Sequence, residues 1–555
     1  MNDATPPSGT LHAPAREELT VAGQVRMIAA LQRSLQQALQ AQQPAARVEV
    51  IETHISFVLV AGGFAYKFKR AVNPGFLDFT TLARRWHYCH EELRLNRRLA
   101  PDLYLDVITV HGTADAPVLG GPGPIIDCAV RMRAFAQEGL WDREITRGAL
   151  RPRHIDELVE LLFAFHRDAA VAGADSRFGD PQQVRRPLRD SLAALDGLLQ
   201  GDADHLRVLA LQAWEAAVGA ALEPVFLQRH RDGRIRECHG DLHLGNVTQI
   251  DGKATVFDCI EFNDDFRWID VISDLAFMAM DLLRHDRADL AHRLVNGYLQ
   301  RSGDYGGTRV LRYYIVHRAL VRAKVAALRA AQEAPASAQP AALDIVRQYL
   351  DLAIATSRPP HPVLMITHGL SGSGKTTLTQ GLLQATGAVR LRADIERKRL
   401  FALAPLDRGG SGPNTGLYSG DATRATYERL LQDASTVVQA GFSVVLDATF
   451  LHRHQRDAAR ELALSLGVPF VLLDFDTDAQ TLRERIRQRS ARADDASDAD
   501  GEVLAAQRLA AEPLAADERA AVFRCPPTTL SADGQPHADW SPLLQRLANP
   551  KGNRT

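Results

Sequence analysis

The most constraining feature of this 555-residue chain is a glycine-rich octapeptide, GLSGSGKT, at residues 369–376. It fits the phosphate-binding pattern G-x-x-x-x-G-K-[ST] and follows the apolar run Val363–Ile366. Glycines let such a loop fold tightly around an anion, so that backbone N–H groups point inward and the next helix adds its dipole. Strand, loop and helix in this order predict an α/β domain with a parallel sheet that binds the phosphates of a nucleotide.

The residues of this loop have expected parts in holding ATP and Mg²⁺. We expect Lys375 to act in catalysis by reaching the β- and γ-phosphates, and the hydroxyl of Thr376 to bind the metal. The expected nucleotide contacts are Gly369, Leu370, Ser371, Gly372, Ser373, Gly374, Lys375, Thr376 and Thr377. Asp447 ends the apolar run VVLD, and a carboxylate at the carboxyl end of a strand can hold Mg²⁺ through water.

Two sets of charged residues after the loop are candidates for binding the acceptor and for neutralising charge at this site. Asp394 follows the run VRL and precedes Arg397, and a base placed there could face an acceptor hydroxyl across the phosphates. The alternative for Asp394 is an N-cap of a helix. In TLRERIRQRSAR, Arg485 and Arg489 share one helix face and could neutralise charge in the transition state, although a solvated basic face fits this pattern as well.

A second signature, HGDLHLGN, lies upstream at residues 239–246. Its H-x-D-x-x-x-x-N spacing would let Asp241 accept a hydroxyl proton and Asn246 bind Mg²⁺. A predicted hairpin with an Asp251-Gly252 turn follows, so Asn246 and Asp258 would stand at its open end, where one metal could contact both side chains. These spacings predict a second and chemically separate phosphotransfer site.

The β-rich start of the chain supplies a cation for this second site. On the predicted strand 64–69, Lys67 and Lys69 alternate with aromatic residues and therefore share one face. One of them should pair with the α- and β-phosphates and with a carboxylate of the next predicted helix, either Glu91 or Glu92. We favour Lys67 and Glu92, and a solvated strand face is the alternative.

Periodicity divides the chain into a tail and two predicted domains. Residues 1–20 are expected to be a disordered tail. A kinase-like α+β domain is expected over 21–356 and the α/β domain over 357–555. A linker-like stretch and Pro359-Pro360 separate the mostly helical pattern before them from the alternating strand and helix pattern after them. The expected elements include helices at 20–45, 80–99 and 341–355, hairpins at 56–69 and 247–257, and strands at 363–367, 389–391, 444–446 and 470–473.

Composition limits the partners and the compartment. A formal net charge of −2 gives no general attraction to nucleic acid or acidic membranes, so the expected acceptor is a small molecule with a hydroxyl group. No stretch approaches the roughly 18 apolar residues of a membrane span. The five scattered cysteines favour a reducing compartment, so a cytoplasmic location is expected. The oligomeric state is left open.

The C-terminal motifs GLSGSGKTT, RADIERKR, VVLDATF and RERIRQRSAR with DASDAD resemble those of the small P-loop kinases, a group that includes gluconate kinase, polynucleotide 5′-kinase and zeta-toxin-like enzymes. The resemblance covers about 362–510. It implies that Asp394 is the acceptor-side base and that Arg397 contacts acceptor or phosphate. It also implies that Arg485 and Arg489 are lid arginines.

The N-terminal motifs HGDLHLGNV, FDCIEFND and DVISDLAF resemble the aminoglycoside-phosphotransferase-like branch of the protein-kinase fold, over about 45–330. No G-x-G-x-x-G loop precedes Lys67, where Gly62-Gly63 stands instead, and no A-P-E pattern follows, so a small acceptor is favoured over a protein. The whole chain is similar to bacterial proteins described as bifunctional aminoglycoside phosphotransferase/ATP-binding proteins. That similarity does not establish an aminoglycoside as the substrate.

The sequence therefore favours an ATP- and Mg²⁺-dependent phosphotransferase with two kinase-type sites. One alternative is a nucleotide-dependent regulatory or toxin-like protein in which only the P-loop half is catalytic. The missing glycine-rich loop favours this alternative, while Asp241, Asn246 and Asp258 oppose it. A second alternative is a nucleic-acid 5′-hydroxyl kinase, in which the basic run 397–399 would hold a phosphodiester.

Overall fold

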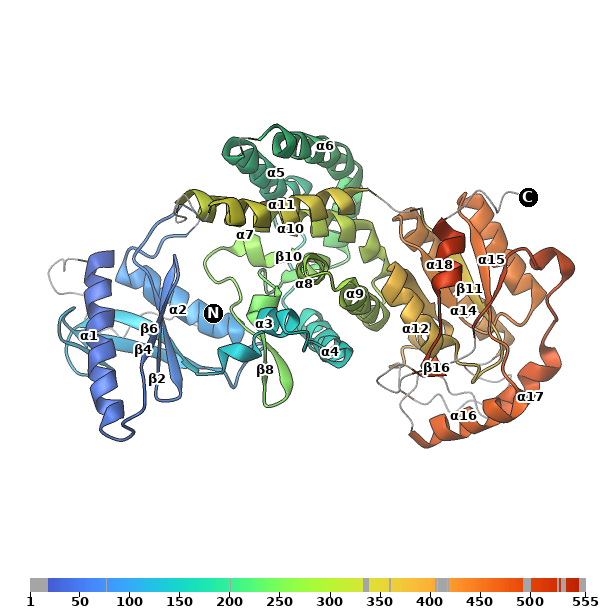
Figure 1. Cartoon of the computed structure of the whole chain (residues 1–555), viewed down its shortest axis with the longest axis horizontal. Helices are drawn as coiled ribbons and strands as arrows, with labels where there is room; N and C mark the ends of the chain where they lie inside the picture. The colour runs from blue at the N-terminus through green and yellow to red at the C-terminus, as the bar shows by residue number, and fades with distance from the viewer. Residues whose placement is uncertain are drawn as a thin grey trace. The chain divides into compact units, whose positions relative to one another are not determined.

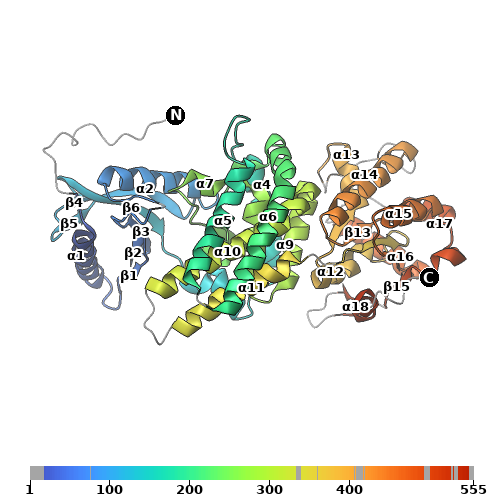
Figure 2. The same ribbon diagram turned by 90° about the horizontal axis from the view of Figure 1, so that it is seen from above.

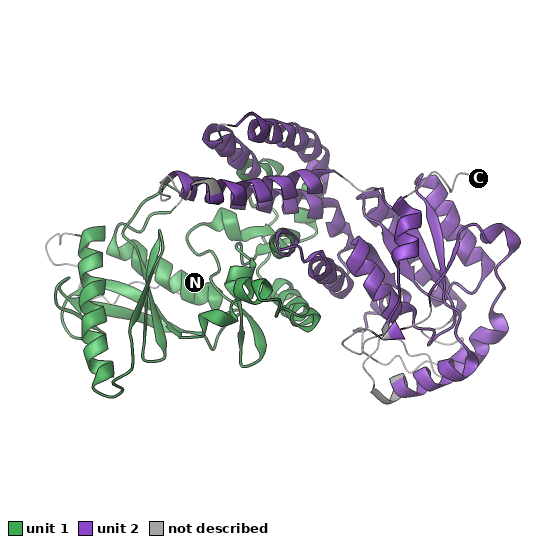
Figure 3. Ribbon diagram, viewed as in Figure 1, with its two compact units in different colours: residues 1–187, 226–281 green, residues 188–225, 282–555 purple. Residues whose placement is uncertain are grey.

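The chain forms two compact units in this computed structural model: residues 1–187 with 226–281, and residues 188–225 with 282–555 (Figure 3). The predicted boundary near residue 357 follows a different division and stays a prediction. The structure describes residues 18–75, 77–199, 201–332, 339–358, 361–404, 407, 417, 419–492, 501–526, 529–530 and 536–548. All but the last three residues of the predicted tail lie outside the described residues, and so does the acidic run DASDAD.

Unit 1 begins with an antiparallel sheet (Figure 1). Its strand order is β1-β2-β3-β6-β4-β5. Its strands are β1 (Glu49–Glu52), β2 (Ser56–Ala61), β3 (Phe64–Lys69), β4 (Tyr104–Gly112), β5 (Pro117–Leu119) and β6 (Ile125–Arg133). The predicted Gly62-Gly63 turn joins β2 to β3 as expected. Its two φ angles of 58° and 81° are ones that glycine adopts without strain.

Two helices cover opposite faces of this sheet. Helix α1 (Val21–Gln40) packs on the face that carries Phe68, and α2 (Leu82–Asn96) packs on the face that carries Ala65. Residues of opposite parity along β3 point to opposite faces, so both faces are buried and the strand is held between two layers. Both predicted helices are confirmed, each a few residues shorter than expected.

The remainder of unit 1 is mainly helical. Its elements are α3 (Trp141–Thr146), α4 (Pro152–Asp168), β7 (Ile235–Glu237), β8 (Val247–Ile250), β9 (Lys253–Val256), α7 (Asp264–Arg267) and β10 (Trp268–Asp270). The residues of α5 (Pro181–Leu198), α6 (Asp202–Arg231) and α8 (Val271–Arg284) are divided between the two units. The hairpin β8–β9 has the predicted Asp251-Gly252 turn, with φ of 51° and 75°. The antiparallel sheet, followed by a mainly helical remainder, confirms the α+β class expected for this part of the chain.

Unit 2 combines helices with a five-stranded parallel sheet in the order β12-β13-β11-β14-β15. The helices before the sheet are α9 (Ala288–Ser302), α10 (Thr308–Gln332) and α11 (Gln339–Ser357). The sheet and its helices are β11 (Leu364–His368), α12 (Lys375–Thr386), β12 (Val389–Arg392), α13 (Ala393–Leu400), α14 (Gly420–Gln439), β13 (Val444–Asp447), α15 (Arg453–Ser465), β14 (Phe470–Asp474), α16 (Ala479–Arg492), α17 (Gly501–Ala510) and β15 (Val522–Arg524). Four strands match their predicted positions to within one residue, and β15 was not predicted. The P-loop α/β class is therefore confirmed.

Parallel pairing places the polar groups of unit 2 at one edge of the sheet. The glycine-rich loop follows β11, while Asp447 ends the neighbouring strand β13. Within the same unit, α9 and α12 lie side by side (Figures 1 and 2). The helix that begins at Lys375 is therefore in contact with a helix from much earlier in the chain.

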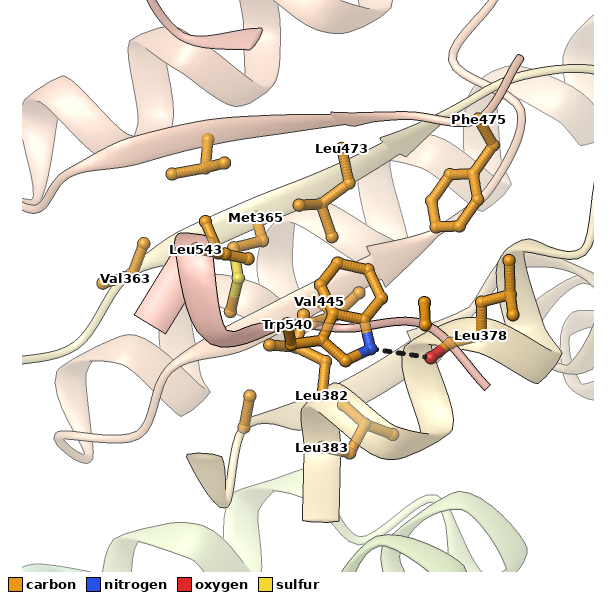
Figure 4. Packing of buried hydrophobic residues seen from close by; sticks show 13 residues of the cluster. Val363, Met365, Leu378, Leu382, Leu383, Val445, Leu473, Phe475, Trp540 and Leu543 are labelled. Atoms are coloured by element: carbon orange, nitrogen blue, oxygen red, sulfur yellow. Dashed lines mark hydrogen bonds between the residues drawn. The ribbon is translucent and has the colours of Figure 1, made fainter. Parts of the chain in front are cut away.

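The C-terminal segment completes the core of unit 2. It contains β16 (Thr529–Leu530), β17 (Pro536–His537) and α18 (Ser541–Ala548). Just before α18, the buried side chain of Trp540 packs with Met365, Leu382 and Leu473 (Figure 4). Its indole N–H donates to the carbonyl of Leu378 at 3.1 Å. In the described part of the chain, no helix has the length and apolarity that crossing a membrane requires.

Two candidate phosphotransfer sites

The loop after β11 in unit 2 has a backbone conformation that depends on glycine. Gly369, Gly372 and Gly374 have φ angles of 141°, 84° and 91°. A Cβ atom on Gly369 would lie 2.6 Å from the carbonyl oxygen of Phe475, too close for any larger residue. The loop leads directly into α12, whose N-terminal N–H groups favour an anion.

Lys375 and Thr376 lie at the start of α12 and make different contacts. The ammonium of Lys375 donates to the carbonyl oxygens of Gly369 and Leu370 at 2.9 and 2.8 Å. The hydroxyl of Thr376 donates to Oδ2 of the buried Asp447 at 2.7 Å. A hydroxyl and a carboxylate are hard oxygen donors of the kind that Mg²⁺ prefers, so this pair fits the expected metal. Thr377 is exposed on the first turn.

The α16–α17 segment contributes two polar groups to the loop. Arg485 donates to the carbonyl of Gly372 at 3.4 Å, so one of the predicted arginines lies at the loop. The side chain of Arg489 lies outside the described ones. Gln507 was not predicted; its Oε1 accepts from the N–H of Ser371 at 3.0 Å. Motif spacing contains no signal for Gln507, because it lies beyond the arginine-rich helix.

Asp394 and Arg397 both lie on α13, which follows β12 directly. The N-cap position of α13 is occupied by Arg392, so Asp394 belongs to the first helical turn and is not the capping residue. Arg397 is buried and donates to the carbonyl of Leu417 and the hydroxyl of Thr423, at 2.9 and 3.1 Å. The structure therefore fixes Arg397 by contacts to backbone and hydroxyl oxygens.

The hydroxyl of Tyr427 on α14 lies within reach of the charges of both residues. Burial raises the pKa of the Tyr427 hydroxyl; Arg397 lowers it and Asp394 raises it, so both charges act at this phenol. Tyr427 also contacts the hydroxyl of Thr449 at 3.5 Å, two residues after Asp447. Sequence reasoning missed Tyr427, which stands in an ordinary helical pattern.

In unit 1, the loop HGDLHLGN holds Asp241 with two neighbours. Asn246 donates from Nδ2 to the carbonyl oxygen of Asp241 at 2.9 Å and to its Oδ2 at 3.2 Å. His243 has its Nε2 3.4 Å from the same carboxylate oxygen. The predicted base and one predicted metal ligand thus lie together.

Asp274 and His239 brace this loop from behind. The carboxylate of Asp274 accepts from the N–H groups of His239 and Gly240, at 2.8 and 2.9 Å. His239 Nε2 lies 2.8 Å from the carbonyl oxygen of Phe257 and so ties the loop to the residue before Asp258. Burial lowers the pKa of His239, which favours its neutral form.

Lys67 lies between two carboxylates. Its ammonium is 2.8 Å from Oε1 of Glu92 and 2.5 Å from Oδ1 of Asp258. Burial by itself would raise the pKa of Glu92, but Lys67 and Lys69 outweigh it and lower that pKa to about 2. Glu91, the other candidate, pairs with Arg94. The favoured contact between Lys67 and Glu92 is therefore present.

Asp258 has an uncommon backbone conformation at this point. Its φ of 66° lies in the left-handed region, where residues other than glycine are strained. The hydroxyl of Tyr104 accepts from the N–H of Asp258 at 3.2 Å. With Asn246 and Asp258 the site offers amide and carboxylate oxygens, a donor set that fits Mg²⁺.

Sequence reasoning missed the part played by Glu261. Lys69 is 1% exposed and contacts both the second oxygen of Glu92 and the carboxylate of Glu261. The two lysines thus divide the oxygens of one glutamate between them. Glu261 stands three residues after Asp258, so the only available signal was a second acidic residue close to the predicted metal ligand.

Comparisons with known proteins place these two sites in known domain families. Residues 82–314 match the model of the phosphotransferase enzyme family, and residues 364–514 match that of an AAA domain. Two relatives are the uncharacterized protein Rv2004c of Mycobacterium tuberculosis (strain H37Rv) and the uncharacterized protein Mb2027c of Mycobacterium bovis. Each is 33% identical over 465 residues, which is 83% of this chain and 89% of the relative. The chain belongs to their family. With a phosphotransferase domain and a kinase-like P-loop domain, it is an ATP-dependent kinase.

Solved structures resemble each part at low identity. A choline/ethanolamine kinase family protein from Mesorhizobium loti is 12% identical, covers 60% of this chain and 99% of its own, and has a TM-score of 0.36. An aminoglycoside phosphotransferase from Alicyclobacillus acidocaldarius is 17% identical over 56% of this chain and 89% of its own, with a TM-score of 0.33. A sugar kinase from Janibacter sp. HTCC2649 is 23% identical over 30% and 84%, with a TM-score of 0.24.

Proposed function

We propose that the chain is a Mg²⁺·ATP-dependent phosphotransferase with two sites, each of which phosphorylates a hydroxyl group of a small molecule. The observation that carries this proposal is the same in both units. In each unit, a carboxylate expected to bind the metal contacts a residue expected to bind the phosphates or the metal. Asp258 lies 2.5 Å from Lys67, and Asp447 lies 2.7 Å from Thr376. The cysteine pattern also supports a cytoplasmic location.

At the site in unit 1, Asp241 would accept the proton of the acceptor hydroxyl. Asn246 and Asp258 would hold Mg²⁺, which supplies charge neutralisation at the transferred phosphoryl group. Lys67 would turn from Asp258 toward the α- and β-phosphates while it keeps its contact with Glu92. The buried position of Glu92 supports this role. Its ionised carboxylate holds the ammonium of Lys67 from one side, while the partner on the other side, Asp258, is more exposed.

At the site in unit 2, the backbone N–H groups of the loop and Lys375 would hold the β- and γ-phosphates. Thr376 and Asp447 would hold Mg²⁺, directly or through water. On the acceptor side, Asp394 would act as the base and Arg397 would position acceptor or phosphate. Arg485 and Arg489 would offset the charge that develops during transfer.

ATP consumption by the full chain tests the proposal. The panel of acceptors contains sugars, aminocyclitols, choline, nucleosides and short oligonucleotides, and the variants are Asp241→Ala, Lys375→Ala and the double variant. We expect each single variant to abolish the use of a different acceptor, and the double variant to abolish both. Asp175→Ala, on an exposed turn, is the matched control and should behave as the wild type.

Each unwanted outcome has a distinct meaning. If Asp241→Ala leaves every acceptor in use, the site in unit 1 is not catalytic and only the P-loop site transfers phosphate. If only the oligonucleotides are phosphorylated, the small-molecule acceptor is wrong. If both single variants retain full turnover, the two-site proposal fails entirely.

A further inference from the structure

Strand β12 is an edge strand of the sheet in unit 2, and its outer edge is covered by one side chain. Asn296 of α9 accepts from the N–H of Arg390 at 2.8 Å and donates to the carbonyl of Ala388 at 2.9 Å. These are the two backbone groups that a neighbouring strand would pair. The second Nδ2 hydrogen goes to the carbonyl of His292 at 3.1 Å, so both N–H donors of the buried amide are used.

The side chain of Arg390 continues this path to the phosphate-binding helix. It is buried, and its Nη1 donates to the carbonyl oxygen of Thr376 at 2.7 Å, while its Nη2 donates to Gln380 at 3.1 Å. Thr376 is the residue whose hydroxyl contacts Asp447. The guanidinium therefore holds the backbone of the residue expected to bind the metal.

The charge of Arg390 acts at the same place. Burial lowers the pKa of its guanidinium to about 10, and Asp447 raises it, so the group stays protonated near neutral pH. Among the described residues, no carboxylate forms an ion pair with Arg390, and its Nε has no hydrogen-bond partner. Burying an unpaired charge is costly, and an anion bound at the neighbouring loop would offset part of that cost.

A second contact holds the acceptor-side helix from the same direction. Tyr305, just after α9, donates from its hydroxyl to Glu396 of α13 at 3.0 Å. Arg399 of α13 donates to the carbonyl of Gln300 at 2.7 Å. Residues 288–305 thus contact both β12 and α13, two elements that are consecutive in the chain.

We propose that Asn296 is a positioning residue of the P-loop site: it fixes β12, and through Arg390 it fixes the first turn of α12 for metal binding by Thr376. This inference rests on the proposed nucleotide site of unit 2. It goes beyond that site because α9 lies inside the residues matched by the phosphotransferase family model. The metal affinity of the P-loop site then depends on a side chain from the other family domain.

Nucleotide binding by the full chain tests this role. The probe is AMPPNP, a non-hydrolysable ATP analogue, titrated by calorimetry with Mg²⁺ and again with EDTA. The Lys67→Ala background leaves the P-loop site to be measured, and the Lys375→Ala background leaves the site in unit 1. In the first background, we expect Asn296→Ala to weaken Mg²⁺·AMPPNP binding by about tenfold or more, as for residues that orient a metal ligand.

The control comes from the same helix and interface. His292 lies one turn before Asn296, and its Nδ1 lies 2.8 Å from the carbonyl of Gln384 near the end of α12. His292→Ala should leave the affinity within about twofold, because it removes a contact of similar strength that does not reach β12. In EDTA, Asn296→Ala and the wild type should bind alike, and the site in unit 1 should not change.

A second variant guards against a folding defect. Arg390→Lys keeps the charge but loses the fork that reaches Thr376 and Gln380. It should weaken binding as Asn296→Ala does, and the double variant should be less than additive because both changes act on one path. The positioning role is overturned if Asn296→Ala matches His292→Ala, or if its effect is equal with and without Mg²⁺. If the wild-type chain binds no nucleotide that the Lys375→Ala variant fails to bind, the proposed function of unit 2 is overturned, and this inference with it.

Discussion

The hydroxyl of Thr376 donates a 2.7 Å hydrogen bond to the carboxylate of Asp447, although the two residues are 71 positions apart in the chain. The bond joins the start of α12 to the end of β13. Parallel pairing of β11 with β13 is what brings the two ends to the same edge of the sheet. Two motifs that the sequence shows separately therefore form one site.

The first prediction concerns this pair. Thr376→Val keeps the shape of the side chain and removes the hydroxyl, so we expect the affinity of the P-loop site for Mg²⁺·ATP to fall by about tenfold or more. Binding of metal-free ATP should not change. Thr386→Val is the matched control, since within the part of the chain that the structure describes its hydroxyl bonds to Leu382 and Ala388, at the far end of α12. Equal affinities of Thr376→Val and Thr386→Val, measured by calorimetry, would contradict the expected metal contact.

The second prediction concerns the buried charges of unit 1. Lys69→Met leaves Glu261 and one oxygen of Glu92 buried without their cation, which should lower the free energy of unfolding by about 3–5 kcal/mol. The double variant Lys69→Met/Glu261→Gln should recover part of that loss, because it removes the unpaired charge. Denaturant unfolding followed by amide exchange in β3 measures both. A double variant as unstable as the sum of its single variants would show that the two residues act independently.

The third prediction concerns the support of the P-loop helix by Trp540. Trp540→Ala empties a buried position and should lower the free energy of unfolding of unit 2 by about 3–5 kcal/mol. Trp540→Phe keeps most of the apolar contact but loses the hydrogen bond to Leu378. It should therefore lower the free energy of unfolding by only about 1–2 kcal/mol relative to the wild type. Thermal unfolding monitored by exchange in α12 distinguishes the two. If the Phe variant is as unstable as the Ala variant, the hydrogen bond and not the apolar packing of Trp540 stabilises unit 2.

The fourth prediction is a pH dependence from His317 of α10. Its ring is buried, neither ring nitrogen has a hydrogen-bond partner among the described residues, and burial lowers its pKa to about 3. The unfolded chain binds the proton near pH 6.5 and the folded chain does not, so stability falls as pH drops from 6.5 toward 3.

At pH 5 this residue should cost about 2 kcal/mol relative to pH 7.5. His317→Leu should lose that part of the pH dependence, as measured by denaturant unfolding at the two pH values. The other histidines contribute equally to both proteins and cancel in the comparison. An unchanged pH dependence in His317→Leu would contradict the burial of a neutral ring.

Local patterns were enough to predict the two loops and the elements around them. The Gly62-Gly63 and Asp251-Gly252 turns, the start of α12 at Lys375 and four strands of the parallel sheet follow from turn chemistry and periodicity over a few residues. The motif spacings also place Asp241, Asn246 and Lys375, because a fixed number of residues in a loop or turn defines where a side chain can reach.

Contacts between distant segments could not be predicted in the same way. Alternation placed Lys67 and Lys69 on one face and gave no basis for choosing between them. The structure shows both lysines in contact with Glu92, and Lys69 also in contact with Glu261. Tyr427 carries no motif at all. Such contacts depend on how helices and strands pack, and packing is specified by many weak interactions spread over the chain.

The sequence by itself determined that this chain carries a P-loop motif and a kinase-type catalytic-loop motif on two different folds, because each motif is a local structure with fixed spacing. Only the tertiary structure decided that Asn296, from a helix before the P-loop domain, covers the edge of β12 and supports Thr376. The physical reason is that an edge strand needs partners for its backbone groups, and any polar side chain brought there by packing can supply them.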